Sequence, residues 1–249
     1  MIAFTPIPTI GIGALQISTH GLIIATGFVV AELLARREAK RRGFNPDYVD
    51  NAAIIAVIAG LVGARIFYII ALGQGMSFVQ MLEVWHGGLS SHGGYLFGIA
   101  AGLGYLYHKR ADILAYADAI MPYVLIGWAI GRIGCFLNWD SYGAVTTSWL
   151  AVVVNGEARY PTQLFESFGY LMSFGIVAVF SRSIKNGMAR KGDKAALSLG
   201  LFAFTRYVVD FFRGDPPQYL LLSRVVTIAV MAACLFFLIY RKRFEAKPR

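Results

Sequence analysis

Charged residues are scarce in this sequence. They make up 15% of its 249 residues, whereas soluble domains carry about a quarter. Hydrophobic residues account for 57%. This balance excludes an ordinary water-soluble domain, because such a domain needs charged side chains to cover its surface. Long apolar runs are present instead, and they place the chain among integral membrane proteins.

Acidic residues and cysteines are also few. Fourteen Asp and Glu stand against 23 Lys and Arg, which gives a net charge of +9. The basic residues lie in short runs between apolar segments, so we expect membrane lipids as partners and no nucleic acid. Two cysteines, Cys135 and Cys234, are too few for a disulfide framework. The first 21 residues lack a basic segment, so a cleavable signal peptide is not expected.

The apolar runs predict the fold class. A spanning helix needs about 20 apolar residues. Seven such segments are expected, at 20–35, 51–72, 92–108, 113–136, 162–181, 196–213 and 219–240. They are expected to be helices, because backbone polar groups in lipid must be hydrogen-bonded within the segment. The sequence therefore predicts an all-α integral membrane protein with about seven transmembrane helices, forming one membrane domain over 1–249.

The basic runs predict the orientation. All but six of the 23 Lys and Arg lie in four segments on one face of a seven-span chain, at 36–42, 109–110, 182–194 and 241–249. Cytoplasmic loops carry the excess of Lys and Arg, so the N-terminus is expected outside and the C-terminus in the cytoplasm. The external connections are then an interfacial arm at 73–91 and a small cap at 137–161. In the cap, Val152–Val154 followed by Asn155 and Gly156 predict a short hairpin.

Arg65, Arg132 and Arg206 fall within predicted spans. A charge at the bilayer centre costs about 2.5–3.5 kcal/mol on insertion scales, so such a residue usually faces a polar cavity and has a partner. Arg65, Arg132 and Arg206 are all expected in the external half of the membrane. Three cations converging there would bind an anionic headgroup, most simply a lipid phosphate.

A structural role for these arginines is the alternative. Arg206 and Asp210 are one helical turn apart and would pair within the membrane. Arg213 continues the same helix face. Arg132 and Arg65 would then pair with Glu166 or Asp140. The sequence leaves both readings open.

Two histidines lie where the arm enters the third predicted span, in WHGGLSSHGG at 85–94. A histidine at a membrane–water boundary can exchange a proton near neutral pH, so His92 is a candidate acid or base. The alternative is a helix-packing glycine motif with a hydrogen-bonded histidine. No third ligand lies at a suitable spacing from these histidines, so no metal site is expected.

A polar group ends the fourth predicted span. Arg132, Asn138 and Asp140 place a cation, an amide and a carboxylate at one membrane exit. Cys135 lies one turn from Arg132, and a neighbouring cation would favour its thiolate. The alternative treats Cys135 as a small apolar packing residue.

Taken together, these segments resemble the prolipoprotein diacylglyceryl transferase family. The resemblance runs in order over most of the chain, through GARIFY (63–68), GGLSSHGG (87–94), GRIGCFLNWDSYG (131–143), YPTQLFES (160–167) and RYVVDFFRGD (206–215). It implies transfer of a diacylglyceryl group from phosphatidylglycerol to the lipobox cysteine of a preprolipoprotein, in the bacterial cytoplasmic (inner) membrane. The products would be a thioether and glycerol phosphate, and no cofactor is implied.

The resemblance also implies which residues carry the reaction. The family's important positions fall on His92, Arg132, Asn138, Asp140, Gly143, Glu166 and Arg206. His92, Arg132 and Arg206 would be catalytic, with the arginines holding the phosphate and His92 acting as a base. Arg65 and Arg213 would make further contacts with the headgroup.

Four positions depart from the family pattern. Cys135 stands where the family usually has asparagine, His20 where it usually has tyrosine, Tyr160 where it often has histidine, and Phe202 where it has tyrosine. Cys135 and His20 are expected at the substrate site. These departures leave two alternatives open: a divergent paralogue with the same donor and another acceptor or mechanism, and a non-catalytic lipid-binding or transport protein.

Overall fold

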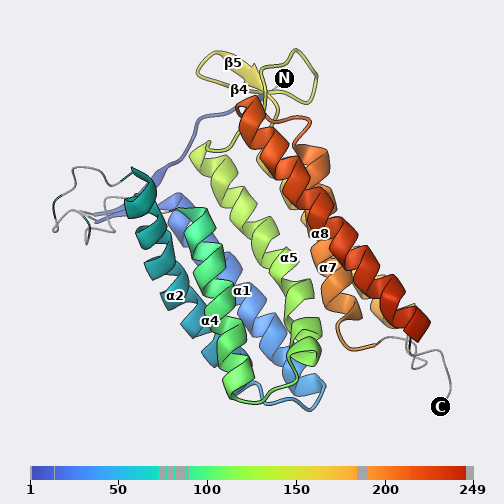
Figure 1. The fold of residues 1–249 in the computed structure, drawn as a ribbon. Coiled ribbons are helices and arrows are strands. Elements are labelled where there is room, and N and C mark those ends of the chain that lie inside the picture. The colour runs from blue at the N-terminus through green and yellow to red at the C-terminus, as the bar shows by residue number, and fades with distance from the viewer. Residues whose placement is uncertain are drawn as a thin grey trace. The chain divides into compact units, whose positions relative to one another are not determined.

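A computed structural model describes residues 2–13, 15–72, 77, 81, 88, 90–183 and 190–244. The chain forms two compact units, Met1–Ala35 with Ala117–Arg249, and Arg36–Tyr116. Within the described ranges there are seven helices, drawn in Figure 1. They are α1 (Thr19–Arg41), α2 (Asp47–Leu72), α4 (Ser91–His108), α5 (Ile113–Asn138), α6 (Thr162–Ser183), α7 (Asp193–Val209) and α8 (Pro217–Phe244).

Each of the seven predicted segments corresponds to one of these helices. Five are long and apolar enough to cross a membrane, within α1, α2, α5, α6 and α8. The other two, α4 and α7, have 18 and 17 residues. A 17-residue helix is about 25 Å long, which is less than the roughly 30 Å of a hydrocarbon core. The predicted segment 196–213 is too long at its end, because α7 stops at Val209 before the turn that contains Gly214 and Pro216.

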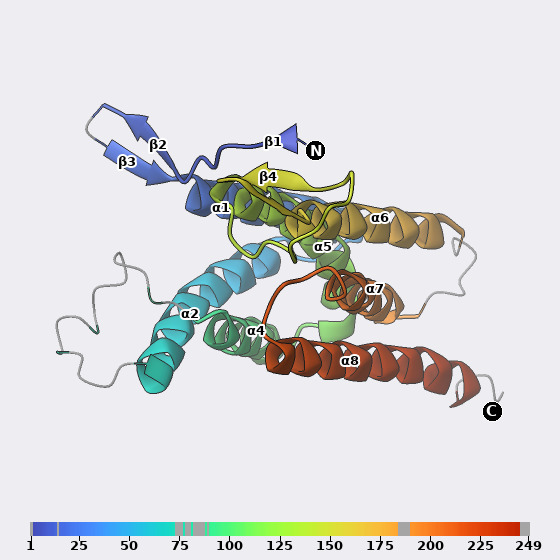
Figure 2. The same ribbon diagram turned by 90° about the horizontal axis from the view of Figure 1, so that it is seen from above.

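Short strands accompany the helices. The predicted hairpin is confirmed: β4 (Val152–Val154) pairs antiparallel with β5 (Glu157–Arg159). Asn155 and Gly156 turn it with φ values of 51° and 83°. The sequence reasoning missed β1 (Ile2–Ala3), which joins β4 in parallel beside the hairpin (Figure 2). It also missed a second hairpin, formed by β2 (Thr9–Ile12) and β3 (Leu15–Ser18).

The core of the larger unit lies between α5, α6 and α7. Leu125, Ala129, Tyr170 and Val177 are its most buried members. Phe202 of α7 stacks on Tyr170 with 4.9 Å between ring centroids. Phe202, which stands where the family has tyrosine, is therefore a core residue.

Close helix contacts in both units depend on glycine. In the larger unit, a Cβ atom at Gly27 of α1 would lie 2.6 Å from the carbonyl oxygen of Gly127 in α5. In the smaller unit, a Cβ atom at Gly93 of α4 would lie 2.2 Å from the carbonyl oxygen of Gly63 in α2. Larger side chains would force these backbones apart. Small residues at helix contacts are typical of membrane proteins, where close packing holds helices together.

A buried carboxylate fixes the start of α7. Asp118 of α5 is 5% exposed. It accepts hydrogen bonds from the backbone N–H groups of Gly192 and Ala195, both at 2.8 Å. The first N–H groups of a helix lack partners within it, and a negative charge there also interacts favourably with the helix dipole. Asp118 therefore ties the beginning of α7 to α5.

Candidate active site

A buried glutamate on α6 gathers the arginines of the larger unit. Glu166 has a side chain that is 1% exposed and forms ion pairs with Arg132 of α5, Arg206 of α7 and Arg213 of the following turn. The Arg206 Nη1 and Arg213 Nη1 atoms lie 2.7 and 3.6 Å from Glu166 Oε1. The Arg132 Nε atom pairs with Oε2 of the same carboxylate. One carboxylate therefore holds three guanidinium groups from three separate segments.

A second buried carboxylate supports Arg206. The Arg206 Nε atom lies 3.1 Å from Asp210 Oδ1, which confirms the ion pair that their spacing predicted. Ser223 of α8 donates its hydroxyl hydrogen to Asp210, and Arg224 Nη2 donates to the Asp210 carbonyl oxygen at 3.1 Å. The sequence reasoning missed the roles of Ser223 and Arg224, although an arginine within an apolar run was a usable signal. Arg206 is thus oriented from two sides.

Gly143 holds the segment that carries Arg213. Its N–H group donates to the Tyr160 carbonyl oxygen at 2.9 Å, and it forms a β-bridge with Arg213. A Cβ atom at Gly143 would lie 2.6 Å from the Phe212 carbonyl oxygen and 2.7 Å from Tyr160 Cβ. Only glycine at position 143 allows the backbone to lie this close to Phe212 and Tyr160. Tyr160 itself packs against Phe212, with 5.4 Å between ring centroids, so this departure from the family pattern belongs to an aromatic cluster.

The arginines are accessible to an anion. The side chains of Arg132 and Arg206 are 14% and 22% exposed. A guanidinium has five N–H donors, more than the ion pairs described here occupy. Arginine forks match the geometry of phosphate oxygens. The cluster can therefore take up a phosphate at its exposed edge while Glu166 holds it from the buried side. The structure confirms ion pairs for Arg132 and Arg206, and anion binding by the same residues stays a prediction.

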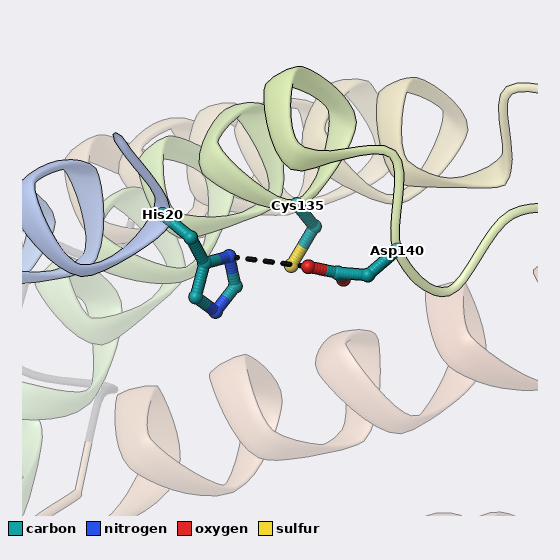
Figure 3. Close-up of side chains that lie close together, drawn as sticks. All are labelled: His20, Cys135 and Asp140. Carbon is teal, nitrogen blue, oxygen red and sulfur yellow. Dashed lines mark ion pairs between the residues drawn. The ribbon is translucent and has the colours of Figure 1, made fainter. Parts of the chain in front are cut away.

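A second group lies beside this cluster and joins His20, Cys135 and Asp140. One ligand atom of each lies within 4.8 Å of the others. Figure 3 shows the three side chains close together. His20 Nδ1 is 3.4 Å from Asp140 Oδ2. Arg132 Nη1 donates to Cys135 Sγ at 3.6 Å and so links the two groups. These residue types are capable of binding a metal ion.

The end of α5 places Asp140 over Cys135. Trp139 and Ser141, on either side of Asp140, have φ values of 57° and 56°. This left-handed conformation is uncommon for residues other than glycine, so neighbouring contacts must hold it. The Asp140 N–H group donates to the Cys135 carbonyl oxygen at 3.1 Å, and Gln163 Nε2 donates to the Asp140 carbonyl oxygen at 2.6 Å. Hydrogen bonds therefore hold both the N–H group and the carbonyl oxygen of Asp140.

Asn138 and Gly134 complete the arrangement. Asn138 Nδ2 donates to Asp140 Oδ2 at 2.8 Å and so orients the carboxylate. A Cβ atom at Gly134 would lie 3.1 Å from Ile23 Cβ and 3.4 Å from the His20 carbonyl oxygen. The glycine allows the first turn of α1 to approach α5, which brings His20 to Cys135.

Two predicted site residues belong to the smaller unit. Arg65 of α2 is 8% exposed and donates to the carbonyl oxygens of Met81 and Gly88, both at 2.9 Å. Its contact with a lipid headgroup stays a prediction. The His92 backbone lies in the first turn of α4, but its side chain lies outside what the structure describes. Its role as a base also stays a prediction.

Comparison with known proteins identifies the family. Residues 8–240 match the prolipoprotein diacylglyceryl transferase family. The chain is 31% identical to the phosphatidylglycerol–prolipoprotein diacylglyceryl transferase of Streptococcus uberis, over 96% of each chain. It is 32% identical to the enzyme of the same name from Symbiobacterium thermophilum, over 96% of this chain and 91% of that one. A Streptococcus pyogenes enzyme of this name is 31% identical over 93% of each chain.

Proposed function

Because the chain belongs to the prolipoprotein diacylglyceryl transferase family, we propose that it transfers the diacylglyceryl group of phosphatidylglycerol to a prolipoprotein cysteine. The structural observation that supports this function is the cluster of Arg132, Arg206 and Arg213 around buried Glu166, at apolar helices and the turn after one of them. The relatives match nearly the whole chain and carry the name of this enzyme, so neither alternative reading is favoured. The protein is a transferase.

The arginine cluster acts on the lipid donor. Arg132 and Arg206 bind the phosphate of phosphatidylglycerol, with Arg213 and Arg65 as further contacts. The phosphate gains a negative charge when its bond to the diacylglyceryl carbon breaks. Donors already in place stabilise this charge without reorganising, which is a large source of catalysis. Glu166 and Asp210 hold the guanidinium groups in position for this step.

The acceptor is the lipobox cysteine of a preprolipoprotein. Its sulfur attacks the diacylglyceryl carbon, a C–S bond forms, and the C–O bond to phosphate breaks. The electron pair of that bond leaves with the phosphate oxygen, giving glycerol phosphate and a thioether. His92 takes the thiol proton, because the thiolate is the nucleophilic form. Asn138, Asp140 and Gly143 shape the site in which the two substrates meet.

The protein is a multi-pass membrane protein, and we propose the finer arrangement as well. All seven helices cross the bacterial cytoplasmic membrane as one domain, with the N-terminus outside and the C-terminus inside. The segment at 73–91 is an external arm, and 137–161 is an external cap. The location of the basic runs supports this orientation.

The reaction can be tested with purified protein, labelled phosphatidylglycerol and a synthetic lipobox peptide. We expect a thioether-linked lipopeptide and released glycerol phosphate, both detected by mass spectrometry. Donor breakdown without a lipopeptide would point to another acceptor. No turnover of the donor, with an authentic transferase active in the same mixture, would contradict the proposed function.

Variants of the arginine cluster test the site. Arg132→Gln and Arg206→Gln each remove donors for the developing phosphate charge, so we expect the transfer rate to fall about a hundredfold to a thousandfold. Arg36→Gln is the control, because Arg36 pairs with Asp50 at 3.3 Å and is 46% exposed. It should keep the wild-type rate. Full activity in both cluster variants, measured on folded protein, would exclude the phosphate-binding role.

A further inference from the structure

We propose that His20, Cys135 and Asp140 bind a zinc ion whose fourth position takes up the acceptor cysteine of the substrate. The proposal rests on the transfer reaction proposed above and assigns the residues that activate its nucleophile. Figure 3 shows the three side chains pointing toward one another, from the first turn of α1, the last turns of α5 and the turn after it.

The distances fit a zinc ion after small side-chain movements. Zinc binds imidazole nitrogen, thiolate sulfur and carboxylate oxygen at about 2.0–2.3 Å, and a tetrahedral arrangement then keeps the ligand atoms about 3.3–3.8 Å apart. The His20 Nδ1 and Asp140 Oδ2 atoms are already 3.4 Å apart. The three ligand atoms all lie within 4.8 Å of one another. Rotations about side-chain bonds are sufficient to close the remaining gap.

The atoms around the group favour metal binding. His20 Nδ1 is buried and makes no hydrogen bond to any described residue, so a coordinate bond would satisfy it. Asn138 donates to the Asp140 carboxylate at 2.8 Å, and Arg132 donates to Cys135 Sγ at 3.6 Å. Hydrogen bonds of this kind orient metal ligands and tune their basicity. The one sulfur, one nitrogen and one oxygen donor suit zinc better than magnesium or calcium.

The group leaves room for a fourth ligand. Structural zinc sites are closed by four protein ligands, whereas catalytic sites use three and keep one position for substrate or water. The described residues offer three ligands here. The side chains of His20 and Asp140 are 30% and 36% exposed, so an incoming thiol can reach them. The site lies at helix ends, where a peptide from the aqueous side can enter.

Coordination at this position activates the acceptor. A thiol that binds zinc loses its proton, which passes to water or to the proposed base. The bound thiolate then attacks the diacylglyceryl carbon, the C–S bond forms, and the C–O bond breaks with its electron pair on the phosphate. A free cysteine thiol is only about 3% ionised at pH 7, so coordination raises the thiolate fraction roughly thirtyfold. Cys135 stays a metal ligand throughout and forms no bond to the lipid.

Cobalt can report the sulfur ligand directly, because a thiolate bound to Co²⁺ gives a charge-transfer band in the near ultraviolet. Chelator-treated protein is titrated with Co²⁺. We expect the band in the wild type and in Cys234→Ser, and its loss in Cys135→Ser. The chain has only these two cysteines, so the comparison assigns the sulfur. His20→Ala and Asp140→Asn should weaken binding at least tenfold. No band in the wild type, or an equal band in Cys135→Ser, would overturn the proposal.

The open position is tested with the acceptor. A lipobox peptide should intensify the cobalt–sulfur band, and the same peptide with serine in place of its cysteine should not. An unchanged band with the cysteine peptide would overturn the assignment of the fourth position.

Activity separates this proposal from the transfer reaction itself. At pH 7, zinc-free protein should transfer at least tenfold more slowly than zinc-loaded protein, and added zinc should restore the rate. Equal rates with and without zinc would overturn the metal's role while the transferase function stands. Metal binding by the triad without any transfer, beside an active control enzyme, would overturn the transferase function and with it the acceptor role of the zinc.

Discussion

Glu38 and Glu166 are both held by arginines, but the arginines come from different places. Glu38 of α1 pairs with Arg41 and Arg42, its neighbours three and four residues along the same helix. The Arg41 side chain is 71% exposed. Glu166 pairs with arginines from α5, α7 and the following turn, and none of the three is more than 22% exposed. The Arg42 side chain is 19% exposed, so the two groups differ less in burial than in origin. The first group is a contact within one helix, whereas the second requires the folded bundle.

The difference shows what makes a charged group useful for chemistry. A local pair forms wherever the helix forms, and it fixes nothing beyond its own helix. The Glu166 cluster gathers donors that a single helix cannot present together. It also keeps them in a region of low dielectric, where a phosphate is attracted more strongly than in water.

Removing the central carboxylate should have the largest effect. Glu166→Ala leaves three guanidinium groups close together without their counter-charge, so we expect a loss of about 3–5 kcal/mol of stability. Glu38→Ala should cost about 1 kcal/mol, because both of its partners lie on the same helix and the Arg41 side chain is 71% exposed. Thermal unfolding in detergent measures both. Similar melting temperatures for the two variants would remove the distinction between the groups.

A methyl group at Gly143 should act on function more than on folding. Gly143→Ala must displace the segment that carries Arg213, and a shift of about 1 Å near a reacting centre can lower the rate about a hundredfold. Gly104→Ala is the matched control, because a Cβ atom there meets nothing within 4 Å. It should keep full activity and gain up to about 1 kcal/mol of stability. Transfer rates and melting temperatures of the two variants test this prediction. Equal transfer rates for Gly143→Ala and Gly104→Ala would show that Gly143 does not position the site.

Added salt should have the smallest effect on stability. It should weaken the exposed Glu38–Arg41 pair more than the buried Glu166–Arg206 pair. The Debye length falls to about 3 Å at 1 M salt, so exposed pairs are screened while buried pairs are not. In double-mutant cycles, the coupling of Glu38 with Arg41 should fall from about 0.5 kcal/mol toward zero. The coupling of Glu166 with Arg206 should be unchanged. A large salt effect on the second pair would show that water reaches Glu166.

Local features were predictable from the sequence. The seven helices follow from the lengths of the apolar runs. The Arg206–Asp210 pair follows from their spacing of one turn, and the β4–β5 hairpin from Asn155–Gly156 after a run of valines. Each of these depends on a few consecutive residues whose backbone geometry is fixed by the chain itself.

Features that depend on packing between helices were not predictable in the same way. Glu166 was only one of several candidate partners for the arginines, because spacing along one helix does not set contacts with another. His20 and Cys135 are separated by more than a hundred residues, and they meet because Gly134 allows α1 to approach α5. The pairing of β1 with β4 also joins segments that have no common local signal.

The anchoring of α7 by Asp118 has a consequence for the depth at which the arginines lie. Arg132 follows Asp118 on α5 by 14 residues, and Arg206 follows Gly192, which Asp118 binds, by the same number. At 1.5 Å per residue, both helices advance about 21 Å from this common origin. Both arginines therefore lie at the same distance along their helices from the contact between Asp118 and the start of α7. Inserting a single residue between the contact and the arginine on either helix would shift that arginine by about 1.5 Å along the helix axis. It would also rotate the arginine by about 100° about the axis, away from Glu166.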